Sequence, residues 1–290
     1  MMRFLLVFLF FSSLTGYTQT PEVGKLCSLK EGMSADEIMK IVYHNKYSLF
    51  CKDITFKGEV IYVDSPTLMR KRKYIKHRII LGKDDFSYKE LTAITYPTEV
   101  KGLAILVWSY LLPQKDQQVW LWLPTLKKVR KISASQDDDA FMGSDFTVEE
   151  VSTRRFEDET YRLIGEKLFS GYKFKYKDEI LFKGRDCFVI EAHPKKAHWY
   201  YDKRIIWVDK KTGGHIYEEY FDRKKRLFKK IFRNWKLIKV GDKLYPTQTA
   251  LEAEDLRTHH RTVILMRDIK YDQDLEESLF TVKTLMRSRW

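Results

Sequence analysis

The sequence predicts a mainly β protein of the α+β class, with one early helix followed by many strands. Tyr, Phe and Trp together make up 14% of the 290 residues, and aromatic side chains suit a pleated, half-buried surface. Beyond residue 52 the apolar residues recur with a period of two, and short polar turns separate the runs. Consecutive strands joined by short turns form an antiparallel meander, which we expect to be strongly curved into a barrel or half-barrel.

Residues 1–20 have the pattern of a cleavable secretory signal peptide. A single basic residue, Arg3, precedes the apolar run Phe4–Phe11, and small and polar residues follow it. The run is about half of the ~20 residues that a membrane-spanning helix needs, and a short buried helix is the alternative interpretation. Cys27 lacks the preceding small residue that lipid attachment requires. We therefore expect an exported, soluble periplasmic protein without a lipid anchor.

The first element of the exported chain is a helix over Ser34–Leu49. Ser34 and Glu37 form a capping box, in which the serine accepts from the Glu37 amide and the glutamate reaches back. Ile38, Ile41 and Val42 then follow at helical spacing.

The period-two pattern begins directly after this helix. Gly58, Ser65-Pro66, Pro97, Gly102 and Pro124 punctuate it. We expect six strands in this half, at Lys52–Asp64, Leu68–Leu81, Phe86–Thr95, Leu103–Tyr110, Gln118–Leu123 and Lys127–Ile132.

The second half repeats the pattern after an interruption at Thr147–Gly171, where we expect a second helix or an irregular covering segment. The strands expected here are Lys183–His193, Arg204–Val208, His215–Phe221, Leu227–Leu237, Lys243–Ala250 and Arg261–Tyr271. Because no linker rich in Gly, Pro or Ser divides the chain, residues 21–290 are predicted to form a single domain.

The sequence contains no recognisable catalytic or metal-binding motif. It lacks H-E-x-x-H, G-x-S-x-G, a Walker loop and C-x-x-C. Gly143-Ser144-Asp145 lacks the flanking glycine of a nucleophile elbow, and Asp137-Asp138-Asp139 lacks the spaced ligands of a calcium loop. We expect no cofactor, no metal and no enzymatic activity.

Three cysteines, Cys27, Cys51 and Cys187, are an odd number for an oxidising compartment. A Cys27–Cys51 bond would link the first helix to the first strand, but sequence alone does not decide pairing, so the disulfide state stays open.

Several strands are apolar on both faces. In Gln118–Leu123, Val119, Leu121 and Leu123 alternate with Trp120 and Trp122. An ordinary antiparallel sheet leaves one face polar, so both faces of this strand must be covered. Either an apolar ligand cavity or a filled sandwich core satisfies this requirement.

The chain carries 53 Lys and Arg against 40 Asp and Glu, a formal net charge of +13. Two basic segments stand out, Met69–Arg78 and Arg223–Lys230. They are either solvated strand faces or docking surfaces for an acidic partner or an anionic membrane. An exported protein does not meet nucleic acid. The docking candidates are Arg70, Lys71, Arg72, Arg223, Lys224, Lys225 and Arg226.

Three motifs resemble those of the LolA-like family of outer-membrane lipoprotein-sorting proteins. They are Tyr96–Leu103 (YPTEVKGL), Val119–Ile132 (VWLWLPTLKKVRKI) and Phe141–Phe146 (FMGSDF). Trp122 replaces a tyrosine of the family pattern, and Lys131 replaces an arginine. The resemblance runs from about Phe56 to Leu285, nearly all of the exported chain.

This resemblance implies an incomplete antiparallel β-barrel under a helical lid, similar to LolA and LolB, that shields acyl chains in an apolar cavity. It implies a non-enzymatic, monomeric periplasmic carrier for lipid or lipoprotein acyl chains, in lipoprotein sorting or lipid transport. The alternative function is an accessory protein of an RND-type exporter that docks through basic faces and transports no ligand. Within the motifs, we expect Arg130 and Asp145 to join two segments by an ion pair or hydrogen bond. The cavity candidates, each of which is otherwise a core residue, are Trp108, Trp120, Trp122, Phe141, Met142 and Phe146.

Overall fold

The computed structural model describes residues 21–63, 69–112, 114–132 and 138–286. The predicted signal peptide lies outside the described residues. No helix among the described residues is long and apolar enough to cross a membrane.

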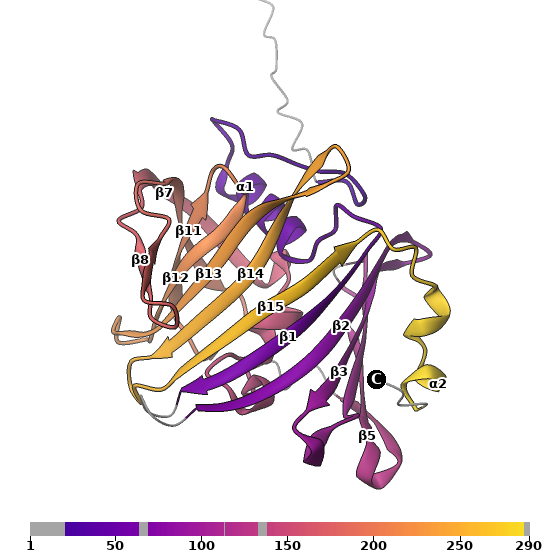
Figure 1. Ribbon diagram of the computed structural model, residues 1–290. Helices are drawn as coiled ribbons and strands as arrows, with labels where there is room; N and C mark the ends of the chain where they lie inside the picture. The colour runs from indigo at the N-terminus through magenta and orange to yellow at the C-terminus, as the bar shows by residue number, and fades with distance from the viewer. Residues whose placement is uncertain (1–20, 64–68, 113, 133–137, 287–290) are drawn as a thin grey trace, which may run out of the picture.

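One large, strongly curved antiparallel sheet dominates the molecule (Figure 1). Its order is β6-β5-β4-β3-β2-β1-β15-β14-β13-β12-β11-β10-β7, so β6 and β7 are edges and the barrel stays open. The strands of the first half are β1 (Asp53–Val63), β2 (Met69–Lys83), β3 (Phe86–Tyr96), β4 (Ala104–Tyr110), β5 (Gln118–Leu123) and β6 (Lys128–Ile132). Those of the second half are β7 (Glu159–Leu168), β10 (Asp186–Pro194), β11 (Lys203–Asp209), β12 (Gly214–Phe221), β13 (Leu227–Val240), β14 (Lys243–Asp255) and β15 (Arg261–Tyr271). The predicted fold class is confirmed.

The concave face of the sheet is covered by α1 (Ala35–Lys46) and by residues 138–158, here called the cover segment. Ser34 caps α1 through the predicted capping box, and Ile38, Met39 and Val42 pack against β10 and β11. The cover segment contains the 3-10 turns Phe141–Gly143 and Phe156–Asp158 and the π-helical turn Glu149–Thr153. These elements form the helical lid of the incomplete barrel.

The interruption predicted at Thr147–Gly171 is only half correct. Its first part is irregular cover, but Glu159–Leu168 forms the edge strand β7, paired with β10. Of the apolar residues of β7, Tyr161 and Leu163 pack inward beside the buried Glu159, whereas Ile164 and Leu168 are exposed, so period two does not stand out.

The convex face is covered in two places. A hairpin of β8 (Tyr172–Phe174) and β9 (Glu179–Leu181), which the sequence did not predict, packs over β13, β14 and β15. The C-terminal elements η7 (Glu277–Phe280) and α2 (Val282–Leu285) pack over β3, β4 and β5. Figure 1 shows α2 beside that end of the sheet.

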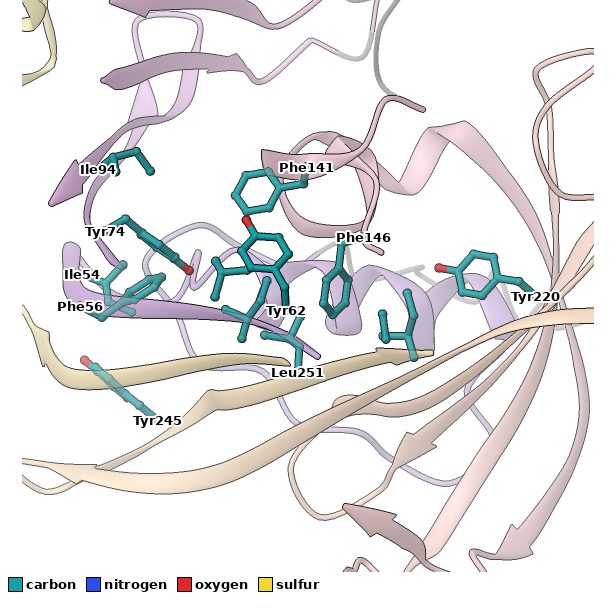
Figure 2. Close-up of a cluster of buried hydrophobic side chains, with 14 of the residues drawn as sticks. Ile54, Phe56, Tyr62, Tyr74, Ile94, Phe141, Phe146, Tyr220, Tyr245 and Leu251 are labelled. Atoms are coloured by element: carbon teal, nitrogen blue, oxygen red, sulfur yellow. The ribbon is translucent and has the colours of Figure 1, made fainter. Parts of the chain in front are cut away.

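A glycine in β1 leaves room for an aromatic ring of β2 near the centre of the sheet. Gly58 in β1 lies opposite Tyr74 in β2, and a Cβ at Gly58 would lie only 2.0 Å from the Tyr74 ring. Tyr74 can therefore lie flat over the strand and join the concave-face core (Figure 2).

Candidate functional site

An apolar cavity of about 390 Å³ lies between the concave face of β3–β6 and the cover segment. Its volume is in the range of ~300–1,000 Å³ in which small-molecule sites fall. Side chains at alternate strand positions form its wall, because successive residues of a strand point to opposite faces. The apolar lining residues are Ile94, Val100, Leu103, Ile105, Val107, Val119, Leu121, Ile132, Ala140, Phe141, Met142 and Val148.

The three predicted tryptophans do not line this cavity, which corrects the sequence interpretation. Val119 and Leu121 face the cavity, so Trp120 and Trp122 of the same strand face the convex side. Trp122 is buried there against Leu106 and Phe280.

Trp108 belongs to the same convex-face cluster. Its indole Nε1 donates to the Phe280 carbonyl at 2.9 Å, and its ring centroid lies 4.6 Å from that of Trp120. The apolar residues on the two faces of β5 are thus covered differently. Those on the concave face line the cavity, and those on the convex face belong to a filled core.

The three candidates in the cover segment divide between cavity and core. Phe141 and Met142 line the cavity, whereas Phe146 is fully buried in the core against the sheet. Figure 2 shows Phe146 pointing from its loop toward the strands that carry Tyr62 and Leu251. The Phe141 amide donates to the Phe146 carbonyl at 2.7 Å, which closes the loop between them.

Asp145 does not use the partner expected from the motif. Its carboxylate accepts from the Thr262 hydroxyl at 2.6 Å, and its amide donates to the same oxygen at 3.1 Å. The contact with β15 therefore replaces the expected contact with Arg130, which is exposed on β6.

The cavity wall carries one buried carboxylate, Glu90. Lys76 approaches it at 2.6 Å, and Arg78 donates to its other oxygen. Burial alone would raise the pKa of Glu90, but the two cations outweigh it and lower the pKa to about 2. Glu90 is therefore a fixed anion in the cavity wall.

The cover segment is held to the sheet by buried ion pairs that sequence reasoning missed. Glu150 binds Lys229 at 2.6 Å, and the Arg233 guanidinium donates to the Glu150 carbonyl at 3.0 Å. Arg154 pairs with Glu149 and donates to the Tyr220 hydroxyl at 2.9 Å.

The same network continues under α1. Arg204 binds Glu159 at 2.6 Å and also contacts Glu218, and all three side chains are at most 2% exposed. A signal for these residues exists in the sequence, since Arg204 shares the inward phase of β11 with Ile206 and Val208. A charged residue in phase with core residues requires a buried partner.

Among the described residues, no group of His, Cys, Asp and Glu is arranged to hold a metal ion. Cys27, Cys51 and Cys187 are all free thiols, so the Cys27–Cys51 pairing does not form in this structure.

Comparison with known proteins places the chain in a family. Residues 87–287 match a family model described as "Uncharacterized protein". A domain described as an outer membrane lipoprotein-sorting protein from Vibrio parahaemolyticus is 26% identical, with a TM-score of 0.67 over 81% of this chain and 92% of that one. The chain belongs to the family that this model describes, and its fold is LolA-like.

Two further solved structures resemble the LolA-like chain. A DUF1329 family protein from Desulfovibrio piger is 25% identical, with a TM-score of 0.71 over 87% of this chain and 99% of that one. A LolA superfamily protein from Nitrosomonas europaea shares the fold, with 16% identity and a TM-score of 0.60 over 87% of this chain and 100% of that one. No curated protein matches the sequence.

The exposed docking candidates of this LolA-like protein lie along the same rim of the sheet, at the start of β2 and in the turn between β12 and β13. The turns after β1, β3, β5, β12 and β14 lie on the same rim, because consecutive antiparallel turns alternate between the two rims. We call it the basic rim, and it follows the lower edge of the sheet in Figure 1. Its exposed basic residues include Lys71, Lys101, Lys127, Lys128, Arg223, Lys224, Lys225 and Arg257.

Several docking candidates also hold local structure. Arg72 donates to the Met142 carbonyl at 2.8 Å, and both Arg70 and Arg72 stack on the Tyr62 ring. The remaining candidates are exposed, although Lys71 lies 3.4 Å from Glu59, Arg223 donates to His198 at 3.0 Å and Arg226 pairs with Asp222 at 2.7 Å.

Proposed function

We propose that this protein is a non-enzymatic periplasmic carrier that binds an acyl chain of a lipid or lipoprotein in the apolar cavity. The observation that carries the proposal is the cavity itself, walled by aliphatic side chains of β3–β6 and closed by Phe141 and Met142. Its likeness to a domain described as lipoprotein-sorting supports the same function.

An acyl chain suits this site because its binding depends on removing apolar surface from water. Each buried methylene contributes ~0.8 kcal/mol, and the lining offers aliphatic contacts along most of its length. Polar side chains also line the cavity in two groups, Arg72 and Asp139 near Met142, and Gln117, Arg155 and Asp158 away from it. The chain would lie along the aliphatic wall, with its polar end beside one of these two groups.

The basic rim supports transient docking on an anionic membrane. Met69, Tyr96 and Leu126 are 46%, 49% and 62% exposed on this rim, among its basic residues. Apolar residues beside basic ones favour binding to anionic lipid surfaces. Val100, Leu103 and Met142 line the cavity near the same rim, so a docked protein would have its cavity close to the lipid.

Native mass spectrometry with organic extraction, on protein secreted to the periplasm, tests the carrier function. We expect a stoichiometric acyl-containing molecule. A ligand-free mass, together with no binding of fluorescent fatty acids, would refute the carrier. The second candidate, docking on an RND-type exporter, would then be favoured by the basic rim.

Flotation with anionic vesicles tests the rim separately. We expect Lys224→Glu with Lys225→Glu to weaken vesicle association, because both side chains are exposed in the turn between β12 and β13. Lys239→Glu with Lys243→Glu, at the turn between β13 and β14 on the opposite rim, is the matched control. Equal association of the two variants would remove the turn between β12 and β13 from the docking surface.

A further inference from the structure

A second, smaller cavity of about 50 Å³ lies on the concave face beneath the C-terminal end of α1. It is strongly basic, because Lys46, Lys76, Arg78 and Arg233 all line it. Its other polar lining residues are neutral, and none of its lining residues within the described part of the chain is Asp or Glu. Four cations around so small a space are costly without an anion.

Three of these cations have carboxylate partners outside the cavity. Lys76 and Arg78 share Glu90, and the Arg233 Nε donates to Glu218 at 2.7 Å. These pairs hold the side chains rigidly around the cavity.

Lys46 differs from the other three. Within the described part of the chain, no carboxylate oxygen lies within 4.0 Å of its ammonium group. Its ammonium group lies over the rings of Tyr43 and Tyr47, 5.5 Å and 5.0 Å from their centroids. Burial lowers the pKa of Lys46 well below its usual value, and the positive charges of Arg233 and Arg154 lower it further, while the more distant Glu218 only partly opposes them.

The charge balance around Lys46 is positive. The concave-face ion network contains five carboxylates, Glu90, Glu149, Glu150, Glu159 and Glu218. It contains seven basic side chains, Lys46, Lys76, Arg78, Arg154, Arg204, Lys229 and Arg233. When Lys46 is protonated, the basic side chains exceed the carboxylates by two, and a bound anion would offset this excess.

A second group in the cavity indicates which kind of anion fits. Asn45 lines the cavity and is 1% exposed, yet its Oδ1 has no hydrogen-bond partner. This oxygen accepts and cannot donate, so its partner must carry a proton. A monoprotonated phosphate supplies both acceptor oxygens for Lys46 and an O–H for Asn45, whereas a carboxylate supplies only acceptors.

We propose that this cavity is an internal binding site for a phosphate group, with Lys46 as its principal cationic contact. The cavity is large enough for this group, because a single water needs ~10–15 Å³ of cavity volume and a phosphate group has only five heavy atoms. The proposal does not depend on the carrier function, because inorganic phosphate alone satisfies it.

A lipid headgroup also carries a phosphate group of this kind. Glu90 lines the apolar cavity, while Lys76 and Arg78, which hold Glu90, line the phosphate site. The π-helical turn likewise presents Ser152 to the apolar cavity and Val151 to the phosphate site. The two cavities are therefore neighbours, separated by side chains.

Thermal unfolding of the full-length protein, titrated with inorganic phosphate and, separately, with a short-chain phosphatidic acid, tests the site. Sodium chloride at equal ionic strength controls for screening. We expect the melting temperature to rise with phosphate and not with chloride, since a ligand that binds only the native state stabilises it. Stabilisation by phosphatidic acid alone would assign the site to a lipid headgroup.

The variant Lys46→Met separates binding from structure. Removing an unpaired, partly buried cation should leave the melting temperature unchanged or raise it, while phosphate affinity falls at least about tenfold. Lys52→Met, which removes an exposed lysine near the end of the same segment, is the matched control and should bind as the parent does.

Proton uptake gives an independent readout. Because the pKa of Lys46 is lowered, phosphate binding should protonate it, and calorimetry in buffers of different ionisation enthalpy should detect the proton. The proposal is overturned if neither phosphate nor phosphatidic acid stabilises the parent protein. It is also overturned if the ligand stabilises the parent and Lys46→Met equally.

Discussion

Filling the apolar cavity should abolish acyl-chain binding without unfolding the protein. Leu121 is half-buried at the cavity wall, where its side chain faces open space. A tryptophan at this position adds about six heavy atoms, and an acyl chain loses ~0.8 kcal/mol for each methylene that it can no longer bury. The full loss is ~5 kcal/mol, and even half of it is on the order of a hundredfold in affinity.

The assay is displacement of a fluorescent fatty acid, with circular dichroism and thermal unfolding to verify the fold. Trp122→Leu is the matched control, because Trp122 is the next residue of β5 and faces the convex side. We expect it to lower the free energy of unfolding by ~3 kcal/mol and to leave affinity unchanged. The reasoning is refuted if folded Leu121→Trp binds normally while Trp122→Leu loses binding.

Three further outcomes follow from the packing and the ion pairs. Phe280→Ala should lower the free energy of unfolding by ~3–5 kcal/mol in urea titrations, since Phe280 is fully buried; a loss below ~1 kcal/mol would contradict that packing. Arg72→Met should accelerate amide hydrogen exchange around Met142, whose carbonyl it holds, whereas Lys73→Met, facing outward from β2, should not; equal exchange would contradict the tether. The pKa of Glu90 is about 2 when folded and 4.5 when unperturbed, so its stabilisation is present above pH 4.5 and is lost as the pH falls toward 2. Glu90→Gln should flatten that part of a stability–pH curve, by about 3 kcal/mol, and an unchanged curve would refute the assignment.

Most elements, though not β7 or the β8–β9 hairpin, could be predicted from the sequence because local patterns determine them. The capping box at Ser34 and the period-two runs depend on neighbouring residues only. The face that holds the cavity could not be predicted, since alternation shows that Leu121 and Trp122 point to opposite sides but not which side is filled. That depends on where residues 277–285 pack, more than a hundred residues away in sequence.

The buried ion pairs were missed for a related reason. Arg204 and Glu159 are 45 residues apart, and although Arg204 is in phase with the buried apolar residues of β11, nothing near it in sequence identifies its partner. Only the sheet order, which places β7, β10 and β11 side by side, brings them together. The same limit applies to Lys46, whose basic neighbours come from β2 and β13.

The pairing of β1 with β15 has a consequence for synthesis. The two strands lie in the middle of the sheet, yet Ile54 pairs with Tyr271, near opposite ends of the chain. While the chain is being made, β1 can pair with β2 on one side, but its other edge stays open until β15 emerges. Such distant pairings are slow to form, and open edges are sites of aggregation. The nascent protein therefore carries an unprotected strand at its centre for most of its synthesis, and the two halves become one sheet only when nearly the whole chain is available.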